Sequence, residues 1–459
     1  MKDVLLLNPP GDKQYIRDFH CSFSSKADYY WPSPDLVVLS GLLDEAFRVG
    51  VMDAILDKIS AGACLERILR GRYGAVIFTT GTATLKSDLA LAAALKAARP
   101  ETKIVASAGI LKFEGRRLLA GHPALDACLT DYADPELEAY LRGERGRPLR
   151  GLIYRNGGGF VASEGTPERE FTVPVPRHDL FAFRKFRNPV ARRLPFTVVV
   201  TSIGCPYRCG FCAAGAWGYR TRPVDNILPE LRFLGRLGVK EILFLDPTLT
   251  VGAGRVIELC RSMVSEGLRF TWSGNADVRT LTEEKVSWMK KAGCHTVFLG
   301  IESGDDGLLK RYGKPVTADR ARRTVDLLNR HGLRTLGYFI LGLPGETRDM
   351  ALKTIALARS LKLDIASFAF ATPDIGTPLR EEAMARGWIP PDLDVWDSTE
   401  RPLINSGDMT PREVEKLRRR AVRSFYLRPS YVLRKLLQAR SAADFVRLAS
   451  NALALLKKK

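Results

Sequence analysis

The chain has 459 residues, of which 46% are hydrophobic and 26% charged, a balance typical of folded globular proteins. At this length, division into about two or three domains is expected. No run of about 18 uncharged apolar residues is present, so no transmembrane helix is predicted. The short apolar run at the N-terminus ends at Asn8 and two prolines and lacks a small-residue cleavage site, which predicts a first strand and a cytoplasmic protein.

The formal net charge of +19 is unevenly distributed along the chain. Residues 401–459 contain 15 Lys and Arg residues against 4 Asp and Glu residues, a net charge of +11. A basic segment of this kind can meet nucleic acid, an anionic membrane surface or only water, and composition does not choose among the three.

Residues 1–140 alternate between short apolar strands and helices. Strands are predicted at residues 4–7, 49–54, 75–79, 103–107 and 127–130. This order indicates an α/β fold with a parallel, doubly wound (Rossmann-like) sheet, in which ligands bind at the carboxyl ends of the strands. Those ends carry small or hydroxyl residues that either form tight turns only or let a flat ligand approach the backbone: Asn8, Thr79, Thr80, Gly81, Ser107 and Gly109.

Residues 141–195 are predicted to form a connector. Strand-like residues 151–154 and 160–162 flank the turn Asn156-Gly157-Gly158-Gly159, which indicates a β-hairpin. A proline-rich, basic stretch follows, and we place the boundary between the first and second domains in it.

Residues 196–380 repeat a strand–helix unit six times. Strands are predicted at residues 196–202, 241–245, 270–273, 296–301, 335–341 and 365–370. Six units indicate an open, partial (β/α)6 barrel, TIM-like, with its active site at the carboxyl ends of the strands. Residues 381–459 are predicted to form a basic, helical C-terminal region whose last helix spans residues 441–456.

Cys205, Cys209 and Cys212 lie within eight residues, directly after the first predicted strand of the barrel. Thiolates are soft ligands that suit zinc or iron–sulfur clusters. Zinc usually takes four ligands, often as two separated Cys-x-x-Cys pairs, and no fourth Cys or His follows at that spacing. Three thiolates can hold three irons of a [4Fe–4S] cluster and leave the fourth iron open to another ligand.

This Cys-x-x-x-Cys-x-x-Cys motif, with Phe211 before its last cysteine, resembles the cluster-binding motif of the radical S-adenosylmethionine (SAM) superfamily. The resemblance implies that SAM chelates the open iron and is cleaved on reduction to a 5′-deoxyadenosyl radical, which abstracts a hydrogen atom from the substrate. It also implies a one-electron reductant such as flavodoxin or ferredoxin.

Two later strand ends resemble the SAM-contacting segments of the same superfamily, residues 300–304 and 337–347. By this resemblance Glu302 would form a hydrogen bond with the ribose or the amino-acid part of SAM. The backbone near Ile340 and Gly342 would meet the adenine, with Phe211 packed against it. Apart from the resemblance, Glu302 could equally be an ordinary acid at the start of a helix.

A doubly wound domain before this barrel resembles the cobalamin-binding branch of the superfamily, the class B methylases, over about residues 1–380. The resemblance implies that the six residues at the strand ends of the first domain bind cobalamin. It implies methylation or oxidative cyclisation of an unactivated carbon, in a lipid-like or other natural-product substrate. Residues 105–110 and 129–134 depart from the turns common in this branch, on the face expected to hold the nucleotide tail. The long segment Tyr15–Trp31 would cover the corrin, reach the substrate pocket or form a surface flap.

Other functions remain open from the sequence alone. A radical SAM methylthiotransferase acting on tRNA would need a second cluster, for which Cys21, Cys64 and Cys128 are the candidates, and a C-terminal β-barrel. An iron–sulfur electron carrier would normally use four cysteines. The helical tail argues against nucleic acid, and its basic amphipathic helices suggest either peripheral association with the inner membrane face or a solvated helical cap.

Overall fold

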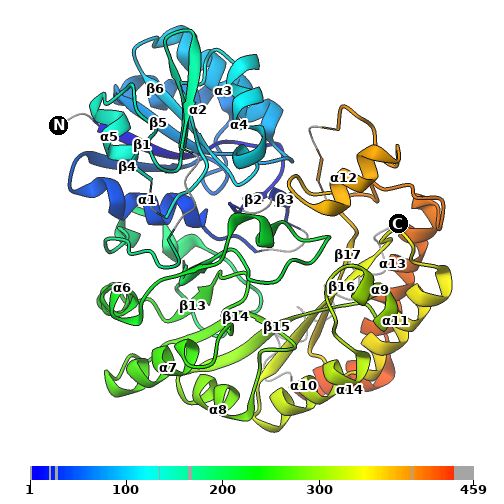
Figure 1. Cartoon of the computed structure of the whole chain (residues 1–459). Helices are drawn as coiled ribbons and strands as arrows, with labels where there is room; N and C mark the ends of the chain where they lie inside the picture. The colour runs from blue at the N-terminus through cyan, green and yellow to red at the C-terminus, as the bar shows by residue number, and fades with distance from the viewer. Residues whose placement is uncertain are drawn as a thin grey trace.

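The computed structural model describes residues 3–19, 22–25, 29–133, 135–163, 168–393, 396–397 and 399–438. These residues form two α/β domains, each built around its own sheet, which lie one above the other in Figure 1. The predicted last helix at residues 441–456 lies outside the described residues. None of the helices described is both long and apolar enough to cross a membrane.

Parallel strands form the centre of the first sheet: β1 (Asp3–Asn8), β4 (Arg48–Asp53), β5 (Ala75–Thr79), β6 (Lys103–Ser107) and β7 (Ala127–Leu129). The surrounding helices are α1 (Pro34–Asp44), α2 (Ala61–Gly71), α3 (Leu85–Ala98), α4 (Leu111–Gly121) and α5 (Leu137–Arg142). Along β1, Val4 and Leu6 pack in a core with α1 and α5, whereas Leu5 and Leu7 pack in a second core with α2, α3 and α4. The spatial order β4-β1-β5-β6-β7, with helices on both faces, confirms the doubly wound sheet.

The glycine-rich turn predicted in the connector does form a hairpin, β8 (Leu152–Asn156) and β9 (Gly159–Ala162). However, β8 also pairs antiparallel with β7, so the hairpin is the edge of the first sheet. The strand up to Tyr154 therefore belongs to the first domain rather than to the predicted connector, because its buried side chains complete the sheet core.

A second, short hairpin lies between the two domains. Its strands are β2 (Tyr15–Arg17) and β3 (Ser22–Ser24), which follow β1 in the sequence. In Figure 1 this hairpin lies between the first sheet and the barrel. It occupies the described part of the long segment whose role the sequence left open.

The second sheet has six parallel strands in chain order: β10 (Phe196–Val199), β13 (Glu241–Phe244), β14 (Thr271–Asp277), β15 (Cys294–Glu302), β16 (Arg334–Leu341) and β17 (Ile365–Phe370). The connecting helices are α6 (Val224–Arg236), α7 (Arg255–Ser265), α8 (Glu283–Lys291), α9 (Asp306–Arg311), α10 (Ala318–Arg330) and α11 (Arg348–Ser360). Because β10 and β17 are the edges of the sheet, the barrel is open, as predicted.

Local sequence sets where the later helices begin. A threonine precedes α8, α10, α11, α12 (Pro378–Ala385) and α13 (Pro411–Tyr426), and its hydroxyl accepts a hydrogen bond from a backbone N–H of the first turn. Thr410 and Glu413 at α13 also form a reciprocal capping box.

The proline-rich part of the connector ties the two domains together. It contains two short 3₁₀ helices, η1 (His178–Leu180) and η2 (Phe183–Lys185). Buried His178 contacts Glu230 of α6 at 2.8 Å, and Glu230 pairs with Arg222 at 2.6 Å. On the other side, Arg177 reaches Asp44 of α1 at 2.6 Å. These contacts fix the connector to both domains.

The predicted C-terminal region is helical from Pro411 to Tyr426 and again from Pro429, whereas its described residues 386–393, 396–397 and 399–410 form no helix. α13 packs against β17 through a buried stripe of Val414, Leu417, Ala421 and Phe425, and α14 (Pro429–Gln438) follows it. Figure 1 shows α13 beside β17 and α11. The tail therefore covers the last strand of the barrel instead of standing free in solvent.

Candidate functional site

The three cysteines lie in the loop from Gly204 to Tyr219, whose neck is closed by a two-stranded sheet. Its strands are β11 (Ser202–Ile203) and β12 (Arg220–Thr221). Gly204 has a φ of 68°, and a Cβ at this position would lie 1.9 Å from the carbonyl oxygen of Gly218. Only glycine fits such a crossing, so the neck fixes the loop at the carboxyl end of β10.

Buried Asp246, which follows β13, holds the chain that enters the loop. Its carboxylate accepts hydrogen bonds from the backbone amide of Thr201 at 2.7 Å and the hydroxyl of Ser202 at 2.8 Å. Asn275 of β14 donates to the Asp246 carbonyl oxygen at 2.8 Å. Three adjacent strand ends are thereby linked beneath the cysteine loop.

Within the loop, backbone hydrogen bonds join Cys212 N–H to the Cys209 carbonyl at 3.0 Å and Cys205 N–H to the Ala214 carbonyl at 3.0 Å. Cys209 is buried, Cys205 is partly buried and Cys212 is exposed. Burial raises the pKa of the Cys209 thiol above its ordinary value. A thiol in that environment needs a bound metal to become a thiolate at neutral pH.

The donor set fits three irons of a cubane cluster. Among the described residues, no three Cys, His, Asp or Glu side chains form a group that could hold one metal ion. In a [4Fe–4S] cluster each thiolate binds a different iron, so the thiols need not converge on a single point. Three thiols from one short loop would suit three irons of such a cluster and would leave the fourth iron without a protein ligand.

Glu302, at the end of β15, lies next to this loop. Its backbone has a φ of 66°, and the β15–β16 register shifts between Gly300 and Glu302. Lys314 donates to its carboxylate at 2.8 Å, and both side chains are buried. Burial lowers the pKa of Lys314, but attraction to Glu302 and Asp277 outweighs it and holds this pKa above its ordinary value. Lys314 therefore carries its positive charge at neutral pH, directly beside the Glu302 carboxylate.

A second ion pair lies on the neighbouring strand end. Arg279 reaches Asp277 at 2.8 Å, and its guanidinium lies 3.8 Å from the centre of the Tyr207 ring in the cysteine loop. The loop is thus bordered by two acid–base pairs and an aromatic ring. Charges fixed in this way can orient a polar ligand at the strand ends without moving themselves.

The aromatic residue of the motif lies in an apolar cluster beside the cysteine loop. Phe211 packs 6.0 Å from the Tyr312 ring, and it shares an apolar cluster with Ile340 of β16. Gly342 has a φ of 86°, and its N–H donates to the buried carboxylate of Glu346 at 2.6 Å. Burial raises the pKa of Glu346 to about 7. The fold therefore brings Phe211 and Ile340 to one apolar surface beside the cysteine loop.

The predicted cofactor residues of the first domain also share one edge, but protein groups already contact them. The Arg17 guanidinium is fully buried there and donates to the side-chain oxygen of Asn8 at 2.7 Å. It also pairs with Asp88 at 2.8 Å, and Thr80 donates to the other oxygen of that carboxylate at 2.8 Å. Ser107 donates to Asp35, and Thr79 lies 3.2 Å from the hydroxyl of Ser33.

The two glycines of this edge are covered as well. A Cβ at Gly81 would lie 2.5 Å from Ser22 of the β2–β3 hairpin. At Gly109 it would lie 2.5 Å from the Phe19 carbonyl oxygen and 2.7 Å from Trp217 of η3 (Ala213–Trp217), which follows the cysteines. The interdomain cavity lined by Phe19 and Trp217 has a volume of about 20 Å³, room for a water molecule or two. With the hairpin and Trp217 in these positions, the edge has no room for a corrin.

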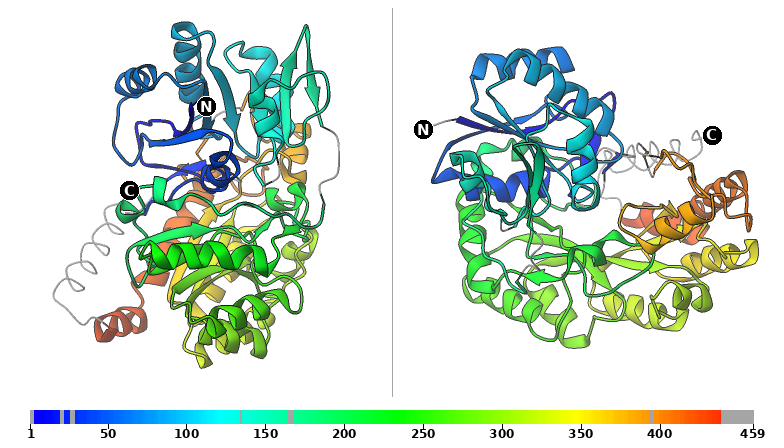
Figure 2. Two further views of the ribbon diagram at one scale, coloured as in Figure 1. Left: turned by 90° about the vertical axis from the view of Figure 1, so that its left-hand side faces the viewer. Right: turned by 45° about the horizontal axis from the view of Figure 1, so that its top comes forward.

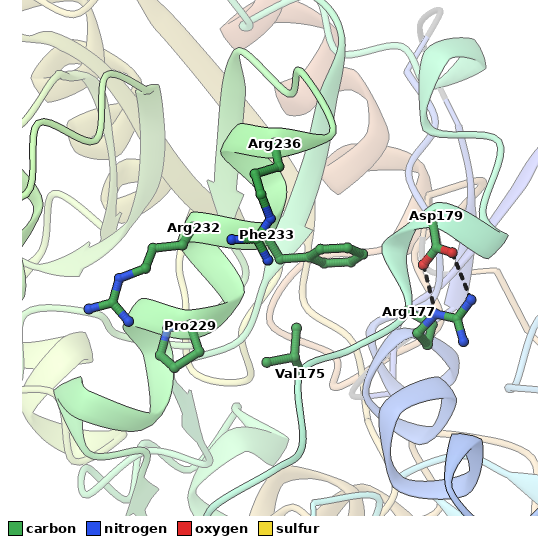
Figure 3. A pocket seen from close by; sticks show the side chains of 7 residues that line it. All are labelled: Val175, Arg177, Asp179, Pro229, Arg232, Phe233 and Arg236. Carbon is green, nitrogen blue, oxygen red and sulfur yellow. Dashed lines mark hydrogen bonds and ion pairs between the residues drawn. The ribbon is translucent and has the colours of Figure 1, made fainter.

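A larger hollow of about 570 Å³ lies elsewhere, between the connector and α6 (Figure 3). Two of its arginines already form ion pairs with acidic side chains. Arg177 pairs with Asp179, and Arg232 pairs with Glu266 at 2.7 Å. None of the predicted site residues lines it. We therefore place the site at the facing strand ends rather than in this open groove.

Sequence reasoning missed Asp246, Lys314 and Arg17. Each acts on a residue far away in the chain, and Lys314 is 12 positions from Glu302 across α9. No local spacing pattern marks such pairs. Their signal is burial of a charged side chain, which only the fold shows.

A family model described as the radical SAM superfamily matches residues 199–358. An uncharacterised methyltransferase of Pyrococcus horikoshii is 30% identical over 417 residues, which cover 89% of this chain and 90% of that protein. The chain belongs to the radical SAM superfamily. Its cofactors are therefore a [4Fe–4S] cluster and SAM, which agrees with the cysteine motif and its position on the barrel.

Two solved structures share the fold across both domains of this radical SAM protein. The radical SAM methyltransferase TsrM from Kitasatospora setae superposes with a TM-score of 0.65 at 19% identity, over 85% of this chain and 77% of that one. The cobalamin-dependent SAM radical enzyme OxsB superposes with a TM-score of 0.73 at 16% identity, over 98% and 70%. These likenesses confirm the predicted order of a doubly wound domain followed by a partial barrel.

Proposed function

We propose that this radical SAM protein modifies an unactivated carbon of a small molecule, by methylation or by oxidative cyclisation. The observation that carries the proposal is the place of the cysteine loop, on the carboxyl edge of the barrel and in contact with the first domain through Trp217 and Gly109. A radical formed at this loop would reach a substrate held between the two sets of strand ends. The name of the P. horikoshii relative supports methylation.

In this proposal Cys205, Cys209 and Cys212 hold three irons of the cluster. When bound, the reduced cluster supplies the electron that cleaves SAM to the 5′-deoxyadenosyl radical. Glu302, held in place by its ion pair with Lys314, accepts hydrogen bonds from the ribose or the amino-acid part of SAM. The apolar surface that includes Phe211 and Ile340 packs against the adenine, whose polar edge meets the backbone at Gly342.

We also propose cobalamin as a second cofactor, at the edge formed by Asn8, Thr79, Thr80, Gly81, Ser107 and Gly109. The fold shared with OxsB, which is named as cobalamin-dependent, supports this proposal. Since the interdomain cavity is too small for a corrin, binding requires the β2–β3 hairpin and Trp217 to move. A flavodoxin or ferredoxin in the cytoplasm would supply electrons, and a lipid-like molecule or another natural product would be the substrate.

The structure favours this reading over a methylthiotransferase with a second cluster. Cys64 and Cys128 are fully buried in the apolar core of the first domain, with Met52 sulfur and the Gly115 carbonyl as neighbours, and Cys21 lies outside the described residues. The described residues after β17 form helices rather than a β-barrel. An electron carrier would have no need of a barrel beside its cluster.

Anaerobic reconstitution tests the proposed function. The full-length protein should take up about four irons, and with dithionite and SAM it should release 5′-deoxyadenosine. The variant C209A should lose both properties, whereas C64A should keep both, with circular dichroism confirming that each variant folds. Zinc in place of iron at the three thiols, or 5′-deoxyadenosine formation by C209A, would refute the assignment. An uptake of about eight irons would favour the two-cluster enzyme.

A further inference from the structure

Exposed apolar side chains gather on the C-terminal helices. Ten large apolar residues are exposed among the described residues, and five of them lie within residues 427–437. They are Leu427 (41% exposed), Val432 (40%), Leu433 (59%), Leu436 (43%) and Leu437 (77%). An exposed patch of this kind marks an interaction surface, because a single exposed leucine is ordinary but a contiguous group is not.

The opposite side of α14 explains why these leucines face outward. Tyr431 donates to the carbonyl oxygen of Asp364 at 3.1 Å, and Arg434 donates to the carbonyl of Leu363 at 2.6 Å. Positions 431 and 434 share one side of a helix, so positions 432, 433 and 436 lie on the other side, with position 437 at its border. The helix is therefore anchored by its polar side and presents its apolar side outward, at the periphery of the molecule in Figure 2.

The outward face of α13 is basic, whereas the outward face of α14 is apolar. The buried stripe of α13 faces the barrel, and its outward face carries five exposed cations: Arg412, Lys416, Arg419, Arg420 and Arg423. Arg419 pairs with Glu415, and Lys416 lies near Glu413, the two acids of this helix. Arg420 and Arg423 make no ion pair with any described residue. Leu427, one turn beyond Arg423, joins this basic face to the apolar face of α14.

We propose that α13 and α14 dock on an anionic lipid bilayer, with the apolar face of α14 entering the headgroup region. Helices that carry leucines on one side and arginines nearby bind to anionic lipid surfaces. This surface lies outside the cofactor site, so the inference does not depend on the proposed function.

Other binding partners fit the basic face of α13 and the apolar face of α14 less well than a lipid bilayer does. A second copy docked by a twofold axis would bring the two basic faces of α13 together, which like-charge repulsion disfavours. Nucleic acid would use the cations but not the apolar face.

Vesicle sedimentation of the full-length protein tests the proposal. Vesicles of phosphatidylcholine with phosphatidylglycerol, mixed three parts to one, should bind the protein, and phosphatidylcholine alone should bind it at least tenfold more weakly. The double variant L433Q/L437Q should lose at least tenfold in binding. The variant R420Q/R423Q should lose the salt-sensitive part of the binding. Val264 on α7 is also exposed (46%), so V264Q serves as the matched control and should bind like the wild type.

The opposing results are distinct. Failure of the wild type to bind anionic vesicles, or unchanged binding by L433Q/L437Q, would overturn the proposal. A wild-type dimer that L433Q/L437Q converts to a monomer in light scattering would assign the face to a second copy. A drop in the melting temperature of L433Q/L437Q without vesicles would show that the leucines are covered by the chain itself. We expect L433Q/L437Q to have the same oligomeric state and the same melting temperature as the wild type.

Discussion

Glu302 shows how one residue is held in place at the site. A φ of 66° is rare for a residue other than glycine, and such backbone strain persists only where surrounding contacts impose it. The contact that does so is the 2.8 Å ion pair with Lys314. A Cβ at Gly300 would lie 2.4 Å from the Glu302 carboxylate and 2.7 Å from the Lys314 amine, so the preceding glycine also makes room for the pair.

Removal of Lys314 tests this role. The variant K314M leaves the Glu302 carboxylate buried without its partner, so we expect a loss of about 3 kcal/mol in the free energy of unfolding. Urea denaturation of the apoprotein measures the loss. K310M, an exposed position on α9, should change stability little, and E302Q/K314M should recover part of the loss because no charge is then buried. A K314M protein as stable as the wild type would contradict the argument.

Among the elements, the neck of the cysteine loop decides whether three thiols of a flexible segment become one site. β11 and β12 are only two residues each, so their pairing contributes little stability by itself. The close crossing of Gly204 and Gly218 and the bonds to Asp246 hold them together. The motif spacing thus supplies the ligands, while the neck supplies their common location.

Two matched glycine substitutions separate strain from contact at this neck. Both glycines have positive φ, but a Cβ at Gly218 meets nothing within 4 Å, whereas one at Gly204 meets the Gly218 carbonyl oxygen at 1.9 Å. G218A should therefore cost about 1–3 kcal/mol, the cost of a backbone conformation that only glycine adopts readily. G204A should cost more and lower the iron content after reconstitution several-fold. Equal stability and full iron loading in both variants would show that the neck does not position the ligands.

At the scale of the whole molecule, the two domains meet through the hairpin and the cysteine loop. The Gly109 N–H donates to the Phe19 carbonyl at 2.7 Å, and Ala83 N–H donates to the Ser22 hydroxyl at 2.9 Å. The buried Arg17–Asp88 pair fastens the same hairpin to α3. The first domain is therefore closed at the edge that we propose for cobalamin.

Hydrogen exchange of the full-length protein can detect whether this edge opens. If cobalamin binds there, hydroxocobalamin should alter the exchange of the Gly109 and Ala83 amides, because the groups that accept their hydrogen bonds must move. Amides of α8 and α10, which contribute no residue to the interdomain cavity, serve as the internal reference and should not change. A corrin spectrum retained after gel filtration, with no change at Gly109 or Ala83, would place cobalamin elsewhere or show that the hairpin stays closed.

The sequence determined the family and most elements of this protein because their signals are local. The three-cysteine spacing, the apolar strands at regular intervals and the threonines that begin the helices can all be recognised within a few residues. Phe211 and Ile340 could also be predicted, because each lies in a short motif that resembles those of the superfamily. The sequence did not predict how closely they pack.

Only the tertiary structure showed which charged side chains pair with one another and which sheet edges are covered. The Lys314–Glu302 and Arg17–Asp88 pairs, the support from Asp246, the attachment of β8 to β7 and the covered strand ends of the first domain join residues that are distant in the chain. Burial sets their energies, and burial belongs to the folded chain rather than to any short segment. For that reason the motif predicts which atoms bind the cluster, while the fold alone determines which groups surround it.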